Sequence, residues 1–311
     1  MERLIAIIGP TAVGKTKISI DLAKMLGTEI ISGDSMLVYR GMNIGTAKPT
    51  LAERDGVIHH LIDILEPSEE FTVVDFQARA SQCIADINRR GKLPILAGGT
   101  GLYVKALLEG YLFHPAPGDA EYRFHLEKLA QDHGNQYLHD RLARVDPITA
   151  SRLHPNDQRR IVRALEVVHL GGDAFSSGTL SENKLIYDAV VIGLTIDRTI
   201  LYQRINQRVD QMLEQGLVAE VKALLEQGIS TGYQSMQGIG YKEIAAYLKG
   251  EADLSTASEK VKQATRHFAK RQLTWYRKMP YVVWFDVNEF TNYDKMLATF
   301  YNYIAGKFDS R

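Results

Sequence analysis

The amino-acid sequence predicts an α/β protein with a three-layer P-loop core, a central and mostly parallel sheet, and an inserted all-helical domain. Three observations support this fold class. The N-terminal residues combine an apolar run, a glycine loop and a helical pattern. Short apolar runs and helical patterns then alternate along the chain. A mainly helical segment interrupts them, so we expect residues 1–113 and 185–311 to form the core and residues 114–184 the insertion.

The first element is the stretch Gly9-Pro10-Thr11-Ala12-Val13-Gly14-Lys15-Thr16, which matches the P-loop pattern G-x-x-x-x-G-K-[ST]. The apolar run 4–8 before it is typical of a buried strand, and apolar residues recur at helical spacing after Lys15. The loop amides and the positive end of the helix dipole then meet at one anion site. The stretch therefore predicts a site for a pyrophosphate-like group.

Two further strands are expected to end at the same edge of the sheet. The run 28–32 leads into Gly33-Asp34-Ser35, and the run 93–97 leads into the glycine-rich turn 98–103. Ligands of open α/β sheets bind at the carboxyl ends of strands. We therefore expect Asp34 to face the bound phosphate group, although an N-cap or turn role is equally compatible with its position. The Thr100 hydroxyl is expected to be available to a ligand.

The rest of the core continues this alternation of elements. Residues 41–50 carry glycines and a proline and are expected to form a loop near the site. The other expected elements are strands at 57–64, 187–194 and 281–285, and helices at 71–90, at 198–225 with an interruption at Gly216, and at about 258–279.

Two segments of the chain are basic. In the insertion, which is bounded by a linker at 114–119 and a polar exit at 171–178, Arg159 and Arg163 share a helix face. The helix near the C-terminus carries seven lysines and arginines and no acid between Lys260 and Lys278, in a chain of zero net charge. Unpaired cations along one element suggest a track for a polyanion, whereas a solvated helix face is the alternative.

Composition narrows the class of protein. The chain has 311 residues, of which 45% are hydrophobic and 24% charged, as is ordinary for a globular protein. A single cysteine, Cys83, excludes an internal disulfide and a Cys-rich metal site. No stretch approaches the ~20 apolar residues of a membrane span, and the N-terminal run lacks a signal-peptide pattern. A cytoplasmic protein without membrane contact is expected.

Together, these stretches resemble tRNA dimethylallyltransferases, and the likeness runs in order along nearly the whole chain. The P-loop alone is shared by many kinds of protein, but the string Asp-Ser-Met-x-Val-Tyr-Arg-Gly at 34–41 is far more specific. The other matching strings are the segments 42–49, His59-His60-Leu61-Ile62-Asp63, 98–103, 156–166, Gly238-Ile239-Gly240-Tyr241-Lys242-Glu243 and Lys270-Arg271-Gln272-Leu273-Thr274-Trp275.

The resemblance implies transfer of a dimethylallyl group from dimethylallyl diphosphate to N6 of the adenine at tRNA position 37, with release of diphosphate. It implies Asp34 as the general base, with Thr100 and Arg123 at the reacting region. The P-loop would hold the diphosphate together with Mg²⁺, for which Thr16 is the expected ligand. Either Arg204 or Arg208 would assist the diphosphate. The residues that the resemblance places against tRNA are Asp34, Ser35, Met36, Leu37, Thr100, Arg123, Asp157, Gln158, Arg159, Arg160, Ile161, Gly240, Tyr241, Lys270, Arg271 and Trp275.

The expected partner is the anticodon stem-loop of tRNA, and the expected assembly is a monomer. The chain lacks the cysteines of the C-terminal zinc finger found in eukaryotic relatives, which favours the bacterial type. Alternatives remain, because a P-loop taken alone indicates ATP. One is a small-molecule kinase in which Arg123, Arg159 and Arg163 clamp phosphates. Another is an enzyme that prenylates free adenine nucleotides, and a third is a nucleotide switch, for which the guanine-reading motif is missing.

Overall fold

The computed structural model describes residues 1–113, 118–171 and 183–308. The chain divides into two compact units, one formed by Met1–Glu109 with Asn183–Arg311 and the other by Gly110–Glu182. The boundaries expected from the sequence for the helical insertion are residues 114 and 184. Most of the expected linker, 114–117, and most of the polar exit, 172–178, lie outside the described residues.

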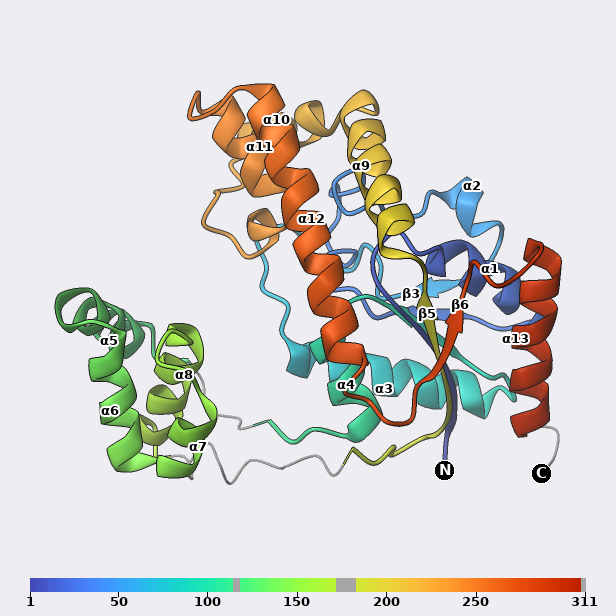
Figure 1. The fold of residues 1–311 in the computed structure, drawn as a ribbon, viewed down its shortest axis with the longest axis horizontal. Coiled ribbons are helices and arrows are strands. Elements are labelled where there is room, and N and C mark those ends of the chain that lie inside the picture. Colours follow the sequence, from blue (N-terminus) through green and yellow to red (C-terminus); the bar gives the residue numbers. More distant parts are fainter. Residues whose placement is uncertain (114–117, 172–182, 309–311) are drawn as a thin grey trace. The chain divides into compact units, whose positions relative to one another are not determined.

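The first unit is built on a sheet in which every described strand pair is parallel (Figure 1). The strand order is β3-β2-β4-β1-β5-β6. Along β1, Leu4, Ala6 and Ile8 join one hydrophobic cluster and Ile5 and Ile7 the other, so both faces of the sheet are covered. The strands are β1 (Arg3–Ile8), β2 (Ile30–Ser32), β3 (His59–His60), β4 (Ile95–Gly98), β5 (Asp188–Thr195) and β6 (Val283–Asp286).

Helices cover the two faces of this sheet. On one face, α3 (Val73–Arg89) and α4 (Gly101–Glu109) contribute Phe76, Ile84 and Val104 to the core. On the other face, α1 (Lys15–Leu26) and α13 (Tyr293–Phe308) contribute Leu22 and Phe300. These layers confirm the predicted three-layer α/β core (Figure 1).

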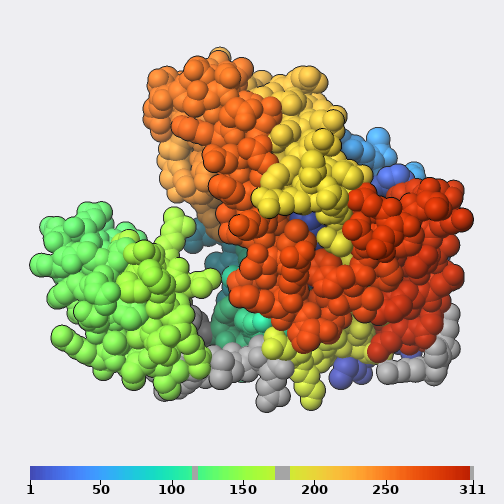
Figure 2. All heavy atoms as spheres, viewed as in Figure 1, coloured from blue at the N-terminus to red at the C-terminus, as the bar shows by residue number. Residues whose placement is uncertain are grey.

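A further group of helices belongs to the same unit. The helical segment predicted at 198–225 is present as α9 (Arg198–Glu214) and α10 (Leu217–Glu226), and the predicted interruption is confirmed, with Gly216 as the N-cap of α10. Helix α11 (Tyr241–Leu248) precedes α12 (Leu254–Tyr276), the basic helix, which Asp253 caps through the Thr256 N–H at 2.7 Å. Helix α9, in yellow, packs along α12, in orange (Figure 2).

Three helices of the described residues were not predicted, and the shortest of them is α2 (Leu51–Arg54). Helix α4 begins at Gly101, inside the segment that was expected to be a turn through Tyr103. Helix α13 follows the last strand, and its buried residues Met296, Phe300, Ile304 and Phe308 recur at intervals of four. That spacing is a helical pattern in the sequence itself. In the other direction, the strand expected at 57–64 is only two residues long.

The second unit is helical in all of its described elements. Its own core contains Leu126, Leu142 and Ile161, which are fully buried. On helix α8 (Gln158–His169), the buried Glu166 carboxylate binds Arg123 at 2.9 Å and Arg163 at 2.6 Å. Burial raises the pKa of Glu166, but its bonds to Arg163, the Asp119 N–H and Arg123 outweigh this and hold the pKa below its usual value. The helices are α5 (Ala120–His133), α6 (Asn135–Val145), α7 (Pro147–Arg152) and α8 (Gln158–His169).

Within the described ranges of both units, no helix is both long and apolar enough to cross a bilayer.

Candidate active site

Three adjacent strands end at the same edge of the sheet, as the sequence predicts. The P-loop (residues 9–16) follows β1, Gly33 and Asp34 follow β2, and Gly99 follows β4. The loops are tied together, because the Gly33 N–H donates to the Ala97 carbonyl at 2.8 Å. A Cβ atom on Gly98 would lie 2.6 Å from the Gly33 carbonyl oxygen. The two backbone segments therefore lie closer together than a residue larger than glycine at position 98 would allow.

These strand ends border a cavity of about 1100 Å³. The P-loop and Asp34 form part of its lining, and residues from α9 and α12 form another part. A third part comes from the loop after Arg40, which was expected to lie near the site. Lining residues from these parts include Thr11, Lys15, Thr16, Asp34, Leu37, Ile44, Lys48, Arg204, Arg208 and Gln272.

The P-loop leads directly into α1. Gly14, with φ of 111°, is the N-cap, and no side chain caps the first turn. The N–H groups of that first turn have no partner within the helix and suit an anion. The Lys15 ammonium donates to the carbonyl oxygens of Gly9 at 2.9 Å and Pro10 at 2.7 Å. Burial, and then the charge of Arg208, lower the pKa of Lys15 to about 7.

The structure distinguishes the two candidate arginines. The Arg208 guanidinium donates to the Thr11 hydroxyl of the P-loop at 3.4 Å. Burial lowers the pKa of Arg208, while the charges of Asp34 and Glu53 counteract this. Arg204 lines the same cavity one helical turn away but is exposed. Arg208 is therefore the arginine that contacts the P-loop.

Asp34 makes the local turn that the sequence allowed and also lies at the cavity, while its role toward a bound phosphate group stays a prediction. One carboxylate oxygen, Oδ1, accepts from the Met36 N–H at 2.8 Å and makes a local turn. The residue also lines the cavity, and within the described part of the chain its Oδ2 accepts no hydrogen bond. The Thr100 hydroxyl, in contrast, accepts from the Ser35 N–H at 3.0 Å and donates to the Ser35 hydroxyl at 3.3 Å. Thr100 thus joins the β4 loop to the Asp34 segment.

Gln272 is a site residue that the sequence analysis missed. Its side chain is 4% exposed and uses both ends of the amide. The oxygen accepts from the Thr11 N–H at 2.8 Å, and the nitrogen donates to the Gly99 carbonyl at 2.7 Å. Gln272 lies four residues from both Phe268 and Tyr276 on the packed side of the basic helix. A polar residue within this apolar series was the pattern that could have indicated it.

Two residues expected to contact tRNA, Ile161 and Tyr241, have buried side chains. Ile161 is fully buried in the core of the helical unit. Tyr241 is fully buried in the first unit, and its hydroxyl donates to Glu220 at 2.7 Å. Both side chains therefore pack the protein interior instead of forming a surface. Trp275 is half-buried, with its ring against Gly101.

Some cations of the basic helix have partners, although the sequence suggests that all of them are unpaired. Lys262 binds Asp210 of α9 at 2.7 Å and Glu259 at 3.3 Å, and Arg266 donates to Asn206 at 2.6 Å. The partners Asp210 and Asn206 come from another helix, so the sequence of α12 could not reveal them. The cations that are exposed are Lys260, Lys270, Arg271, Arg277 and Lys278.

In the helical unit, the predicted tRNA residues lie at the start of α8. Asp157, Arg159 and Arg160 are exposed, and Gln158 is half-buried. Arg123 lies on α5, where its guanidinium binds Glu166. Its expected contact with the reacting region stays a prediction.

The fold and the cavity define a class of protein, a P-loop α/β protein in which a carboxylate, a lysine and an arginine line one cavity. A family model described as IPP transferase matches residues 37–279. The tRNA dimethylallyltransferase of Halalkalibacterium halodurans is 50% identical over 312 residues, which cover 100% of this chain and 99% of that protein. The chain belongs to the IPP transferase family, and the resemblance stated from the sequence is confirmed.

Two solved structures agree with this assignment. The full-length tRNA isopentenylpyrophosphate transferase from Bacillus halodurans is 50% identical, with a TM-score of 0.76 and coverage of 100% of this chain and 98% of that one. A eukaryotic dimethylallyltransferase acting on tRNA is 30% identical, with a TM-score of 0.84 and coverage of 100% and 80%.

Proposed function

We propose that this chain transfers a dimethylallyl group from dimethylallyl diphosphate to N6 of adenosine 37 in tRNA and releases diphosphate. The observation that supports this most is the composition of one cavity. Lys15 and Arg208 provide positive charge beside the P-loop, and Asp34 provides a carboxylate in the same space. The positive charge helps the diphosphate to leave from an allylic diphosphate. The carboxylate can take the proton that an attacking amine must lose.

The first part of the reaction is the departure of diphosphate. The bond between C1 of the allyl group and the bridging oxygen breaks, and its electron pair goes to the diphosphate. Lys15, Arg208 and the N–H groups at the start of α1 stabilise this developing negative charge. Because these groups belong to a folded loop and a helix, they need little reorganisation as the charge appears.

The second part is attack by the adenine amine. Its lone pair is delocalised into the ring, so the N–H becomes acidic only as the new C–N bond forms. The cavity-facing oxygen of Asp34 then takes the proton. General base catalysis of this kind contributes roughly 10²–10⁴-fold in rate.

Magnesium is compatible with the residues present. Among the described residues, no group of three His, Cys, Asp or Glu is arranged to hold a metal ion. Mg²⁺ at phosphates does not require such a group, because phosphate oxygens, water and one or two protein oxygens suffice. The Thr16 hydroxyl lines the cavity and would supply the protein oxygen. Bound there, the ion would neutralise charge on the diphosphate.

RNA binding is assigned to the exposed cations. Lys270 and Arg271 lie in the C-terminal part of α12, Arg277 and Lys278 come directly after its end, and all four suit a phosphate backbone. The target base must leave its stack, which is less costly in a single-stranded loop than in a duplex. Within the described part of the chain, one copy supplies every group named above, so a monomer suffices. A protein that acts on RNA and has a single free cysteine suits the reducing conditions of the cytoplasm.

The decisive experiment is transfer of label from radioactive dimethylallyl diphosphate to an anticodon stem-loop that carries A37. We expect label on this RNA and none on the same RNA with G37. Label on free AMP but not on RNA would replace the proposal with prenylation of nucleotides.

Asp34→Asn tests the general base. Turnover should fall about 10²–10⁴-fold while RNA affinity stays within about twofold, because the amide cannot accept the proton. Asp86→Asn serves as the control, because Asp86 is a half-buried residue of α3 that pairs with Arg89 and does not line the cavity. Equal losses of turnover and affinity would make Asp34 a binding residue.

A further inference from the structure

The geometry points to Glu220 as a positioning residue that shapes the part of the cavity facing the isoprenoid chain. It acts on residues 43–48, here called the wall loop. Glu220 lies on α10 (Leu217–Glu226), and the cavity lining includes no residue of this helix. The inference rests on the proposed function, because that function identifies the substrate as an isoprenoid diphosphate.

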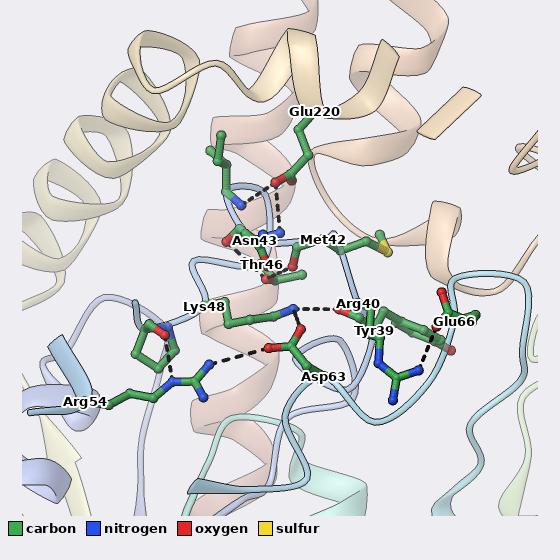
Figure 3. A network of polar contacts seen from close by, with 12 residues as sticks. Tyr39, Arg40, Met42, Asn43, Thr46, Lys48, Arg54, Asp63, Glu66 and Glu220 are labelled. Atoms are coloured by element: carbon green, nitrogen blue, oxygen red, sulfur yellow. Dashed lines mark hydrogen bonds and ion pairs between the residues drawn. The ribbon is translucent and has the colours of Figure 1, made fainter. Parts of the chain in front are cut away.

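The Glu220 carboxylate accepts four hydrogen bonds. Oε2 accepts from the Asn43 N–H at 2.9 Å and the Ile44 N–H at 2.8 Å. Oε1 accepts from the Gly45 N–H at 3.1 Å and from the Tyr241 hydroxyl at 2.7 Å. Figure 3 shows Glu220 reaching from its helix to the backbone of the wall loop. Three successive N–H groups form an anion-binding concavity, and here a side chain of the same protein occupies it.

Tyr241 completes this anchor from α11. A Cβ atom on Gly45 would lie 2.6 Å from the Tyr241 ring, so the wall loop rests directly on the ring and only glycine fits there. Burial raises the pKa of the Tyr241 hydroxyl, and the charge of Glu220 raises it further. The hydroxyl therefore stays protonated and donates to Glu220.

The other end of the wall loop is held separately. The Lys48 ammonium, on a residue only 8% exposed, donates to the Tyr39 carbonyl at 2.6 Å and pairs with Asp63. The Thr46 hydroxyl donates to the Met42 carbonyl at 2.6 Å. Figure 3 shows this lower group of contacts on the same loop as those of Glu220. Both ends are thus fixed, although the loop contains no helix or strand.

The wall loop shares the cavity with the P-loop but differs from it chemically. Its residues Ile44 and Ala47 line the cavity with apolar groups, beside its polar residues Asn43, Thr46 and Lys48. Leu37 and Met212 from neighbouring segments add further apolar groups. These apolar groups suit a five-carbon chain, whereas Lys15 and the P-loop amides suit diphosphate. Glu220 accepts a hydrogen bond from the Ile44 N–H. Loss of that bond should therefore disturb the isoprenoid side of the cavity and leave the diphosphate side intact.

The test compares two ligands on the folded protein, by calorimetric titration of dimethylallyl diphosphate and of inorganic diphosphate. Glu220→Gln keeps the size of the side chain but places an NH₂ group against two of the four donors. Affinity for dimethylallyl diphosphate should fall about tenfold, and affinity for inorganic diphosphate should change less than about twofold. The exposed Glu226→Gln, on the same helix, should change neither affinity.

Equal loss of both affinities, or no loss of either, would overturn the inference. Should Glu220→Gln fail to fold, Tyr241→Phe removes one donor of the four and should show the same selective loss at about threefold. The proposed function fails independently, if the unaltered protein binds both ligands but transfers no label to RNA. In that case the difference between the two ligands still decides the role of Glu220.

Discussion

The P-loop and the wall loop line the same cavity but are stabilised in different ways. In the P-loop, the Lys15 ammonium binds carbonyls five and six residues away, and the loop continues directly into α1. In the wall loop, the Glu220 carboxylate binds N–H groups 175 to 177 residues away. The first shape is thus encoded in a short motif, whereas the second depends on the packing of α10 and α11.

The contrast is not complete, because the P-loop has one long-range contact as well. Gln272 reaches the Thr11 N–H from a position 261 residues away and the Gly99 carbonyl from 173 residues away. The diphosphate side of the cavity therefore combines a local loop with one distant anchor. The following substitutions separate these contributions.

Lys15→Met should have the largest effect, because it removes the cation beside the leaving group. We expect kcat/KM to fall about 10²–10³-fold, as for loss of one preorganised donor. Steady-state kinetics with labelled dimethylallyl diphosphate measures it, with the exposed Lys222→Met as control. A loss below tenfold would mean that the P-loop contributes little to departure of the diphosphate, and the contrast between the two loops would disappear.

Gln272→Leu should have the next largest effect. It leaves the Thr11 N–H and the Gly99 carbonyl without their partner, at about 1–3 kcal/mol for each buried group. Affinity for inorganic diphosphate should fall about tenfold or more, in contrast to Glu220→Gln, where it should hold. RNA affinity serves as the internal control, because exposed Lys270 and Arg271 remain. Unchanged diphosphate affinity would show that the P-loop needs no distant anchor.

The pH dependence of diphosphate binding should be confined to the P-loop side. The pKa of Lys15 lies at about 7, below its usual value, so this ammonium is lost as the pH rises above 7. Affinity for diphosphate should therefore fall above pH 7, by at most about tenfold per pH unit. Comparison with Lys15→Met removes the titration of the ligand itself. The same difference in pH dependence between Lys15 and Met at this position should be found when Glu220→Gln is present in both proteins. Its loss there would show that the wall loop affects the titration of Lys15.

The smallest effect is expected outside both loops. Lys270→Ala combined with Arg271→Ala should weaken RNA binding about fivefold to tenfold and lower its salt slope by up to about two. Binding of both diphosphate ligands should not change. Lys262→Ala is the matched control on the same helix, since Asp210 already pairs with that lysine. If RNA affinity depends on salt equally in the two variants, the exposed face of α12 is a solvated surface that does not bind RNA.

The sequence by itself determined the fold class, the P-loop with its helix, and the joint position of Asp34 and Gly99 at one sheet edge. These features depend on short motifs and on periodicity, which are local properties of a chain. Helix α4 was not predicted, because it begins inside a glycine-rich segment, which is typical of a turn. Helix α13 was not predicted either, even though the spacing of Phe300, Ile304 and Phe308 is helical.

Only the tertiary structure decided which side chains meet in the cavity. It brought Arg208 rather than Arg204 to Thr11, placed Gln272 between two loops, buried Tyr241 beneath the wall loop, and paired Lys262 with Asp210. Each of these contacts joins residues from different elements, mostly far apart along the chain. Such contacts depend on how whole helices pack against the sheet and each other, and no short stretch of sequence contains that information.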